Sequence, residues 1–216
     1  MKKTLSLSAS ALLVVVGLNA NAANVVTNGD FATNATSFSD FPGYADNSGN
    51  PAEIPDWTYT GSVQRGVNGT LAGMHNPFGP TDKSAASTWG FVQQEGSISQ
   101  TIVLQANTTY DISYLAASRS NNPDARGQVT VSDNSTTYYD SGGQHWNRTA
   151  FQAVASQFST GASFDGPVVI TLINTNSIAG DNTVNYSDVV VEAVPEPGSL
   201  ALLTLGGLLI ARRRRG

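Results

Sequence analysis

Few side chains in this sequence could carry out covalent chemistry. Its 216 residues include no cysteine and only two histidines, His75 and His145, which excludes thiol catalysis and disfavours zinc chemistry. No serine lies in a G-x-S-x-G turn, the usual setting of a hydrolase nucleophile. Carboxylate pairs such as Asp133 with Asp140 would support acid–base work only if the fold brought them together. We therefore predict that the protein is not an enzyme and needs no catalytic cofactor.

Tryptophan is the residue type here that best suits a binding site. Trp146 lies in the polar, glycine-led segment GGQHWNR, with Arg148 two residues on. An exposed indole ring offers a flat apolar face to a sugar, and planar polar groups can bond the hydroxyl groups. Trp89 is a second candidate, whereas Trp57 lies in an alternating segment and is predicted to be core. These residues predict carbohydrate binding, and the alternative is that Trp146 folds back over a core edge.

The chain between residues 23 and 194 is strongly acidic. It carries 15 Asp and Glu residues against five basic ones, a net charge of −10. Such a charge repels phosphate backbones, so we expect no nucleic acid partner. It is compatible with an extracellular protein or with one that takes up divalent cations.

The segments that must position these residues read as β-strands. The chain is rich in Thr, Ser, Val, Asn and Gly, alternates in hydrophobicity, and shows no sustained helical period. About ten short strands with Gly-rich turns predict an all-β sandwich or barrel in one domain, residues 23–193. The expected strands are Asn24–Phe31, Trp57–Val63, Ala85–Gln93, Ser97–Leu104, Thr109–Ala117, Arg126–Ser132, Thr136–Asp140, Phe151–Phe158, Pro167–Asn174 and Val184–Ala193.

The first 22 residues have the pattern of a secretory signal peptide. A basic start at Lys2 and Lys3 precedes an apolar run and then the small residues Ala20-Asn21-Ala22, which is how signal peptidase sites are built. We expect signal peptidase to cut after Ala22 and the protein to be exported.

The last residues, 194–216, combine three parts: the triplet Pro195-Glu196-Pro197, an apolar run, and the arginines Arg212, Arg213, Arg214 and Arg215. The run is shorter than the roughly 20 residues of a stable spanning helix. It predicts a short apolar helix that holds a membrane weakly, with the arginines on the cytoplasmic side.

The order of these three parts resembles the PEP-CTERM sorting signal of Gram-negative bacteria. The resemblance implies an exosortase as partner, which recognises the Pro-Glu-Pro motif, removes the tail and leaves the protein at the cell surface or outside the cell. Membrane anchoring through the helix would then be transient.

The body resembles the galactose-binding-like jelly rolls of exported bacterial proteins in the segments NGDFA, PDWTYTG, GSISQTIVL and SDVVVEAVPEP. The resemblance implies a jelly-roll β-sandwich and a structural calcium ion held by Asp30 and Asp188. Ala32 stands where those relatives commonly carry glutamate, so one ligand is missing.

Together these features predict an exported, non-catalytic surface or matrix protein that associates with exopolysaccharide in a biofilm or floc. Two alternatives stay open. One is a purely structural matrix protein without a defined ligand, and the other is a polysaccharide hydrolase.

Overall fold

The computed structural model describes residues 23–45, 49–60, 64–121, 125–164, 166–176 and 182–195. The expected signal peptide, the apolar tail helix and the arginine cluster lie outside them. Within the described ranges no helix is long and apolar enough to cross a membrane.

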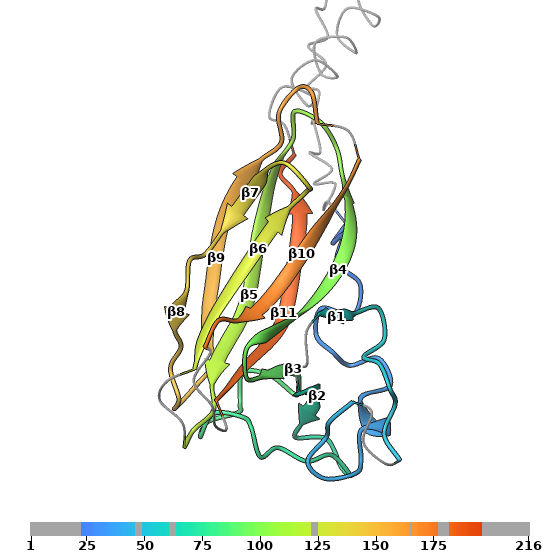
Figure 1. Cartoon of the computed structure of the whole chain (residues 1–216), viewed down its shortest axis with the longest axis vertical. Helices are drawn as coiled ribbons and strands as arrows, with labels where there is room; N and C mark the ends of the chain where they lie inside the picture. The colour runs from blue at the N-terminus through green and yellow to red at the C-terminus, as the bar shows by residue number, and fades with distance from the viewer. Residues whose placement is uncertain are drawn as a thin grey trace, which may run out of the picture. The chain divides into compact units, whose positions relative to one another are not determined.

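Two antiparallel sheets form the body, which confirms the all-β sandwich (Figure 1). One sheet has the order β1-β4-β10-β6-β7, with β8 also paired to β6, and the other has the order β2-β3-β11-β5-β9. We call them the six-stranded and the five-stranded sheet. The strands are β1 Thr58–Thr60, β2 Gln64–Gly69, β3 Thr88–Gln93, β4 Gly96–Leu104, β5 Thr109–Ser118, β6 Arg126–Ser132, β7 Thr137–Asp140, β8 Gln144–His145, β9 Gln152–Ser159, β10 Gly166–Asn174 and β11 Thr183–Ala193, and one 3-10 turn, η1, covers Ala35–Ser37.

Alternation along the strands builds the core. In β10, for example, Val168, Ile170 and Leu172 are buried while Pro167 and Val169 are exposed, as a strand with one buried face requires. The buried faces of both sheets form a single main cluster, which includes Trp57 as expected. Tyr186 of β11 links the layers, because its hydroxyl donates to the backbone oxygen of Ile173 in β10 at 2.6 Å.

The segment expected to be the first strand, Asn24–Phe31, is not a strand. Asn28 and Phe31 have φ angles of 48° and 57°, and this left-handed conformation interrupts extended pairing. The segment nevertheless lies along β11. The Val25 amide donates to the Val191 oxygen at 2.9 Å, and the Val189 amide donates to the Gly29 oxygen at 3.0 Å.

Two strands were not predicted from the sequence. β2 occupies part of an expected loop, and its residues do not alternate, because five of its six residues are buried. Residues Gly43 to Ala45 cover one side of β2 through backbone hydrogen bonds, and its other side pairs with β3. β8 has only two residues, too few to leave a pattern.

Candidate functional site

An open groove of about 690 Å³ lies on the outer face of the five-stranded sheet. Asp111 and Ser113 come from β5, Gln157 from β9, and Val190 and Glu192 from β11. Their neighbours Ile112 and Val191 point the other way, into the core. Strand alternation therefore places every second residue of three adjacent strands in this groove.

The chemistry of the groove is polar and acidic. Glu192 and Asp111 are direct partners across β11 and β5, and Asp111 faces Gln157 across β5 and β9. The Gln157 amide donates to the Asp111 carboxylate at 2.7 Å. No basic residue is among the described residues that line the groove. Such a surface suits hydroxyl groups or cations and repels anions.

A smaller hollow of about 270 Å³ lies where β11 is irregular. The pairing of β11 with β5 shifts between Ser187 and Val190, and Asp188 in this bulge has a φ angle of 49°. Asp188 and Asp30 both line the hollow. Asp30 belongs to the N-terminal segment and lies 158 residues before Asp188 in the sequence. Both residues that the resemblance assigns to calcium thus line this hollow, and the ion itself stays a prediction.

The hollow disfavours the charged form of Asp188. Burial, reinforced by the charge of Asp30, raises the pKa of the Asp188 carboxyl, and a hydrogen bond with Ser187 acts in the opposite direction. A divalent cation would relieve this repulsion.

The residues around the hollow fit a calcium ion only in part. Ala32 contributes no side-chain oxygen, and the Thr88 hydroxyl already donates to the Asp30 backbone oxygen at 2.7 Å. The described part of the chain contains no group of three or more His, Cys, Asp or Glu side chains that could hold a metal. Calcium needs six to eight oxygens, so backbone oxygens and water would have to supply the rest.

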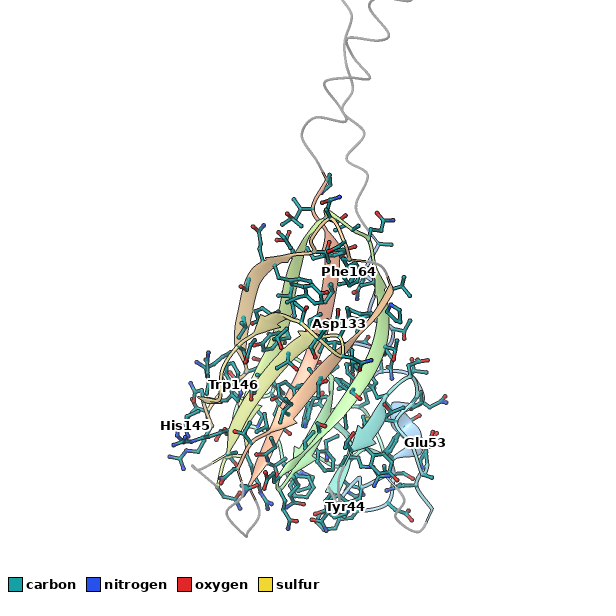
Figure 2. All side chains as sticks on the ribbon, turned by 45° about the horizontal axis from the view of Figure 1, so that its top comes forward. Tyr44, Glu53, Asp133, His145, Trp146 and Phe164 are labelled. Atoms are coloured by element: carbon teal, nitrogen blue, oxygen red, sulfur yellow. The ribbon has the colours of Figure 1, made fainter. Side chains whose placement is uncertain are left out.

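Trp146 does not form an exposed platform, which corrects the expectation from the sequence. Its side chain is 6% exposed and belongs to the main core, with its ring edge-on to Tyr114 at 6.2 Å between centroids. The ring fits because Gly127 has no side chain: a Cβ there would overlap the indole nitrogen. Figure 2 shows Trp146 beside His145, at the margin of the body.

Trp89 is also buried, so it offers no ring face to a ligand either. It is fully buried in a second small cluster with Ala86, Ala117 and Phe151, and its ring lies 5.7 Å from that of Phe151. Arg148 is exposed, and its backbone oxygen accepts a hydrogen bond from Thr81. It does not line either hollow.

Sequence reasoning missed the groove residues Asp111, Gln157 and Glu192. The alternation that placed their neighbours in the core also implied that they point outward. What the sequence does not show is that β11, β5 and β9 are adjacent, because these strands lie far apart in the chain.

The fold and the two hollows define a β-sandwich protein with an open, acidic groove. The chain belongs to the family described as "Protein of unknown function (DUF642)", whose model matches residues 24–169. Residues 193–215 match the PEP-CTERM protein-sorting motif, which confirms the predicted tail signal and implies exosortase-processed export to the cell surface. No curated protein matches the chain.

Solved structures share the fold at low sequence identity. The Stig cyclase Fisc from Fischerella sp. TAU is 14% identical with a TM-score of 0.57, over 82% of this chain and 99% of that one. An apo cyclase from Fischerella sp. is 16% identical with a TM-score of 0.57, over 82% and 98%. The CBM22-1 xylan-binding domain of Paenibacillus barcinonensis Xyn10C is 14% identical with a TM-score of 0.47, over 65% and 86%. At these identities the cyclase likenesses establish the sandwich fold alone.

Proposed function

We propose that this protein is an exported, non-catalytic surface or matrix component that binds exopolysaccharide through the groove on the five-stranded sheet. Signal peptidase would release its N-terminus and an exosortase would process its tail, with transient membrane association before release. The observation that carries the proposal is the row of Glu192, Asp111 and Gln157 across three adjacent strands.

The groove suits an extended sugar chain for two reasons. It is open rather than enclosed, so a polymer can lie along it without threading. Its carboxylate and amide groups offer several hydrogen bonds to hydroxyl groups, and Val190 and Ala155 supply small apolar surface between them. Since the described lining includes no aromatic ring, we expect weak binding per site.

Its charge selects among polysaccharides. The acidic groups of the groove disfavour uronate or sulfate groups, so the ligand is a neutral polysaccharide. Acidic polymers would bind only with a cation between the two surfaces.

A pull-down with neutral and acidic polysaccharides tests the proposal. Gln157→Ala and Asp111→Ala each remove one hydrogen-bonding group from the groove and should weaken binding about tenfold. Thr130→Ala, on the outer face of the six-stranded sheet, is the matched control and should bind as the wild type does. If the wild type retains no polysaccharide, the alternative of a structural matrix protein without a ligand is favoured.

The alternative function is a polysaccharide hydrolase, and the neighbouring carboxylates of Asp111 and Glu192 are the observation that favours it. Glycoside hydrolysis needs two carboxylates that flank the bond to be cut. Here one Asp111 oxygen already accepts the Gln157 amide, which favours a binding role. Release of oligosaccharides on incubation with the polysaccharide, abolished in Asp111→Asn, would overturn the non-catalytic assignment.

The hollow at Asp30 and Asp188 carries a second proposal, a structural calcium ion. The raised pKa of the Asp188 carboxyl, which is partly buried beside Asp30, supports it, because a cation would favour the charged form of Asp188. A thermal melt with and without chelator tests it, and an unchanged midpoint would rule the ion out.

Mass spectrometry of the protein recovered from medium and envelope tests the processing steps. We expect an N-terminus at Ala23 and loss of the tail that contains Arg212 to Arg215. An intact tail in the extracellular pool would contradict processing, whatever the body binds.

A further inference from the structure

Strand β9, Gln152–Ser159, is the uncovered edge of the five-stranded sheet. It pairs with β5 on one side without any shift in register. Among the described residues, no backbone group bonds to its other side. Six of its eight residues are exposed, and Figure 1 shows it at the margin of the body, beside β7 and β8 of the other sheet.

One backbone hydrogen bond next to β9 shows which of its amide and carbonyl groups point away from β5. The Thr160 amide, just after β9, donates to the Thr108 oxygen, just before β5. In an antiparallel pair the backbone groups of every second residue point to the partner strand, so those of Phe158, Ser156 and Val154 point to β5 as well. The amides and carbonyl groups of Ala153, Ala155, Gln157 and Ser159 therefore face away from β5. With respect to the described residues, they form a row of unpaired donors and acceptors along an extended edge.

The other three sheet edges are protected, and β9 is not. Backbone bonds from Gly43 and Ala45 cover β2, and β1 has only three residues. β7 has four residues, shifts register and ends in a charge, Asp140. Proteins usually protect long edges with charge, proline, a bulge or a covering segment. β9 is longer than β1, β2 or β7. It contains no charge, proline or bulge, and no segment in the described part of the chain pairs with its free side.

We propose that β9 is a self-association edge, which pairs antiparallel with β9 of a second copy around a twofold axis. Charge is the reason for choosing a second copy as the partner. The body has a net charge of −10, so most of its surface repels another copy, whereas the eight residues of β9 carry no charge at all. Main-chain pairing there needs no side-chain complementarity.

This pairing has a consequence for the groove. Ala155, Ser156 and Gln157 of β9 line it, so the two grooves would lie next to each other on one continuous ten-stranded sheet, five strands from each copy. Two weak sites on one polymer chain bind with greater avidity than either alone. The association itself does not depend on the polysaccharide proposal.

Sedimentation velocity of the mature protein over a range of concentrations tests the edge. Ala153→Pro removes an outward amide that β5 does not use, and should raise the dimer dissociation constant at least about tenfold. Ala153→Thr keeps the amide in the same position and should dimerise as the wild type does. Ala153 is not among the described residues that line the groove.

Two further measurements keep the test decisive. If circular dichroism shows that Ala153→Pro does not fold, Ala153→Lys places two like charges at the edge and should dissociate the dimer. Hydrogen exchange of the wild type should show that the amides of Ala153, Ala155 and Gln157 become protected only as concentration rises. A wild type that stays monomeric throughout, or proline and lysine variants that associate as tightly as Ala153→Thr, would overturn the proposal.

Discussion

The hydroxyl of Tyr186 connects β11 of one sheet to β10 and β6 of the other. It lies 2.6 Å from the Ile173 oxygen and 3.3 Å from the Gln128 oxygen, and burial raises its pKa well above the usual value. Tyr186→Phe would leave the partly buried Ile173 carbonyl group without this donor, so we expect a loss of about 1–2 kcal/mol in the free energy of unfolding. Urea unfolding measures it. Tyr59→Phe, at an exposed ring, is the control and should change stability by less than about 0.5 kcal/mol.

The pH dependence of stability at Asp188 should differ between a calcium-bound and a calcium-free protein. Because its pKa is raised on folding, the folded protein binds the proton more tightly than the unfolded chain. Its contribution to stability is therefore full in acid and is lost as pH rises through the folded pKa. Without a cation, Asp188→Asn should raise the melting temperature at neutral pH and leave it unchanged in acid.

Asparagine is a suitable replacement because it tolerates the left-handed backbone at this position. In excess calcium, a bound ion would reverse the order of melting temperatures, with Asp188→Asn now the less stable. The same order with and without calcium would contradict the ion but leave the repulsion between Asp30 and Asp188 intact.

At the level of single residues, the sequence indicated which side chains could share a site more reliably than it indicated which side chains are exposed. It identified Asp30 and Asp188 as neighbours through a resemblance, and the structure brings them into one hollow. It left two alternatives open for Trp146, an exposed platform and a ring folded back over a core edge, because polar residues surround this tryptophan in the chain. Its apolar surroundings, Tyr114 and the space over Gly127, come from other strands.

The N-terminal segment acts as an additional element of the five-stranded sheet. The Asn24 side-chain oxygen accepts from the amides of Val26 and Val191, both at 3.0 Å, and its amide donates to the Val189 oxygen at 3.5 Å. We expect Asn24→Ala to cost about 1–2 kcal/mol and to speed hydrogen exchange at the Val191 amide. Thr27→Ala, in the same segment, should do neither. Equal exchange in both variants would show that the main-chain bonds alone hold the segment.

Strands with an alternating pattern were predictable as elements. β6 has the expected bounds, and β4, β5, β10 and β11 differ from expectation by one residue at one end. β9 is shifted by one residue at both ends. The N-terminal segment was mistaken for a strand, because its sequence does not reveal the left-handed residues Asn28 and Phe31. β2 was missed because burial on both faces removes the alternation by which strands are recognised.

Over the whole molecule, the acidic charge is the main electrostatic feature. A body with a net charge of −10 repels itself, and salt screens this repulsion. We expect the melting temperature of the mature protein to rise by a few degrees between about 10 mM and 150 mM sodium chloride. Tetramethylammonium chloride at the same ionic strength is the control. A rise with sodium alone would indicate site binding rather than screening.

The sequence also predicted the destination of the molecule, because the sorting motif is a contiguous pattern that needs no fold to be recognised. The groove is the opposite case. It exists only once β11, β5 and β9 are adjacent, and strand order is not written in any local pattern.

The bonds between the Asn24–Gly29 segment and β11 bear on how this protein is made. The segment that begins at Asn24 is held by the last strand of the sandwich, so the sheet cannot close until the whole sandwich has emerged. Contacts between such distant parts of a chain form slowly, since a large loop must close first. A chain that crosses a membrane from its N-terminus would therefore stay unfolded during passage. The fold can therefore be completed only after translocation has ended.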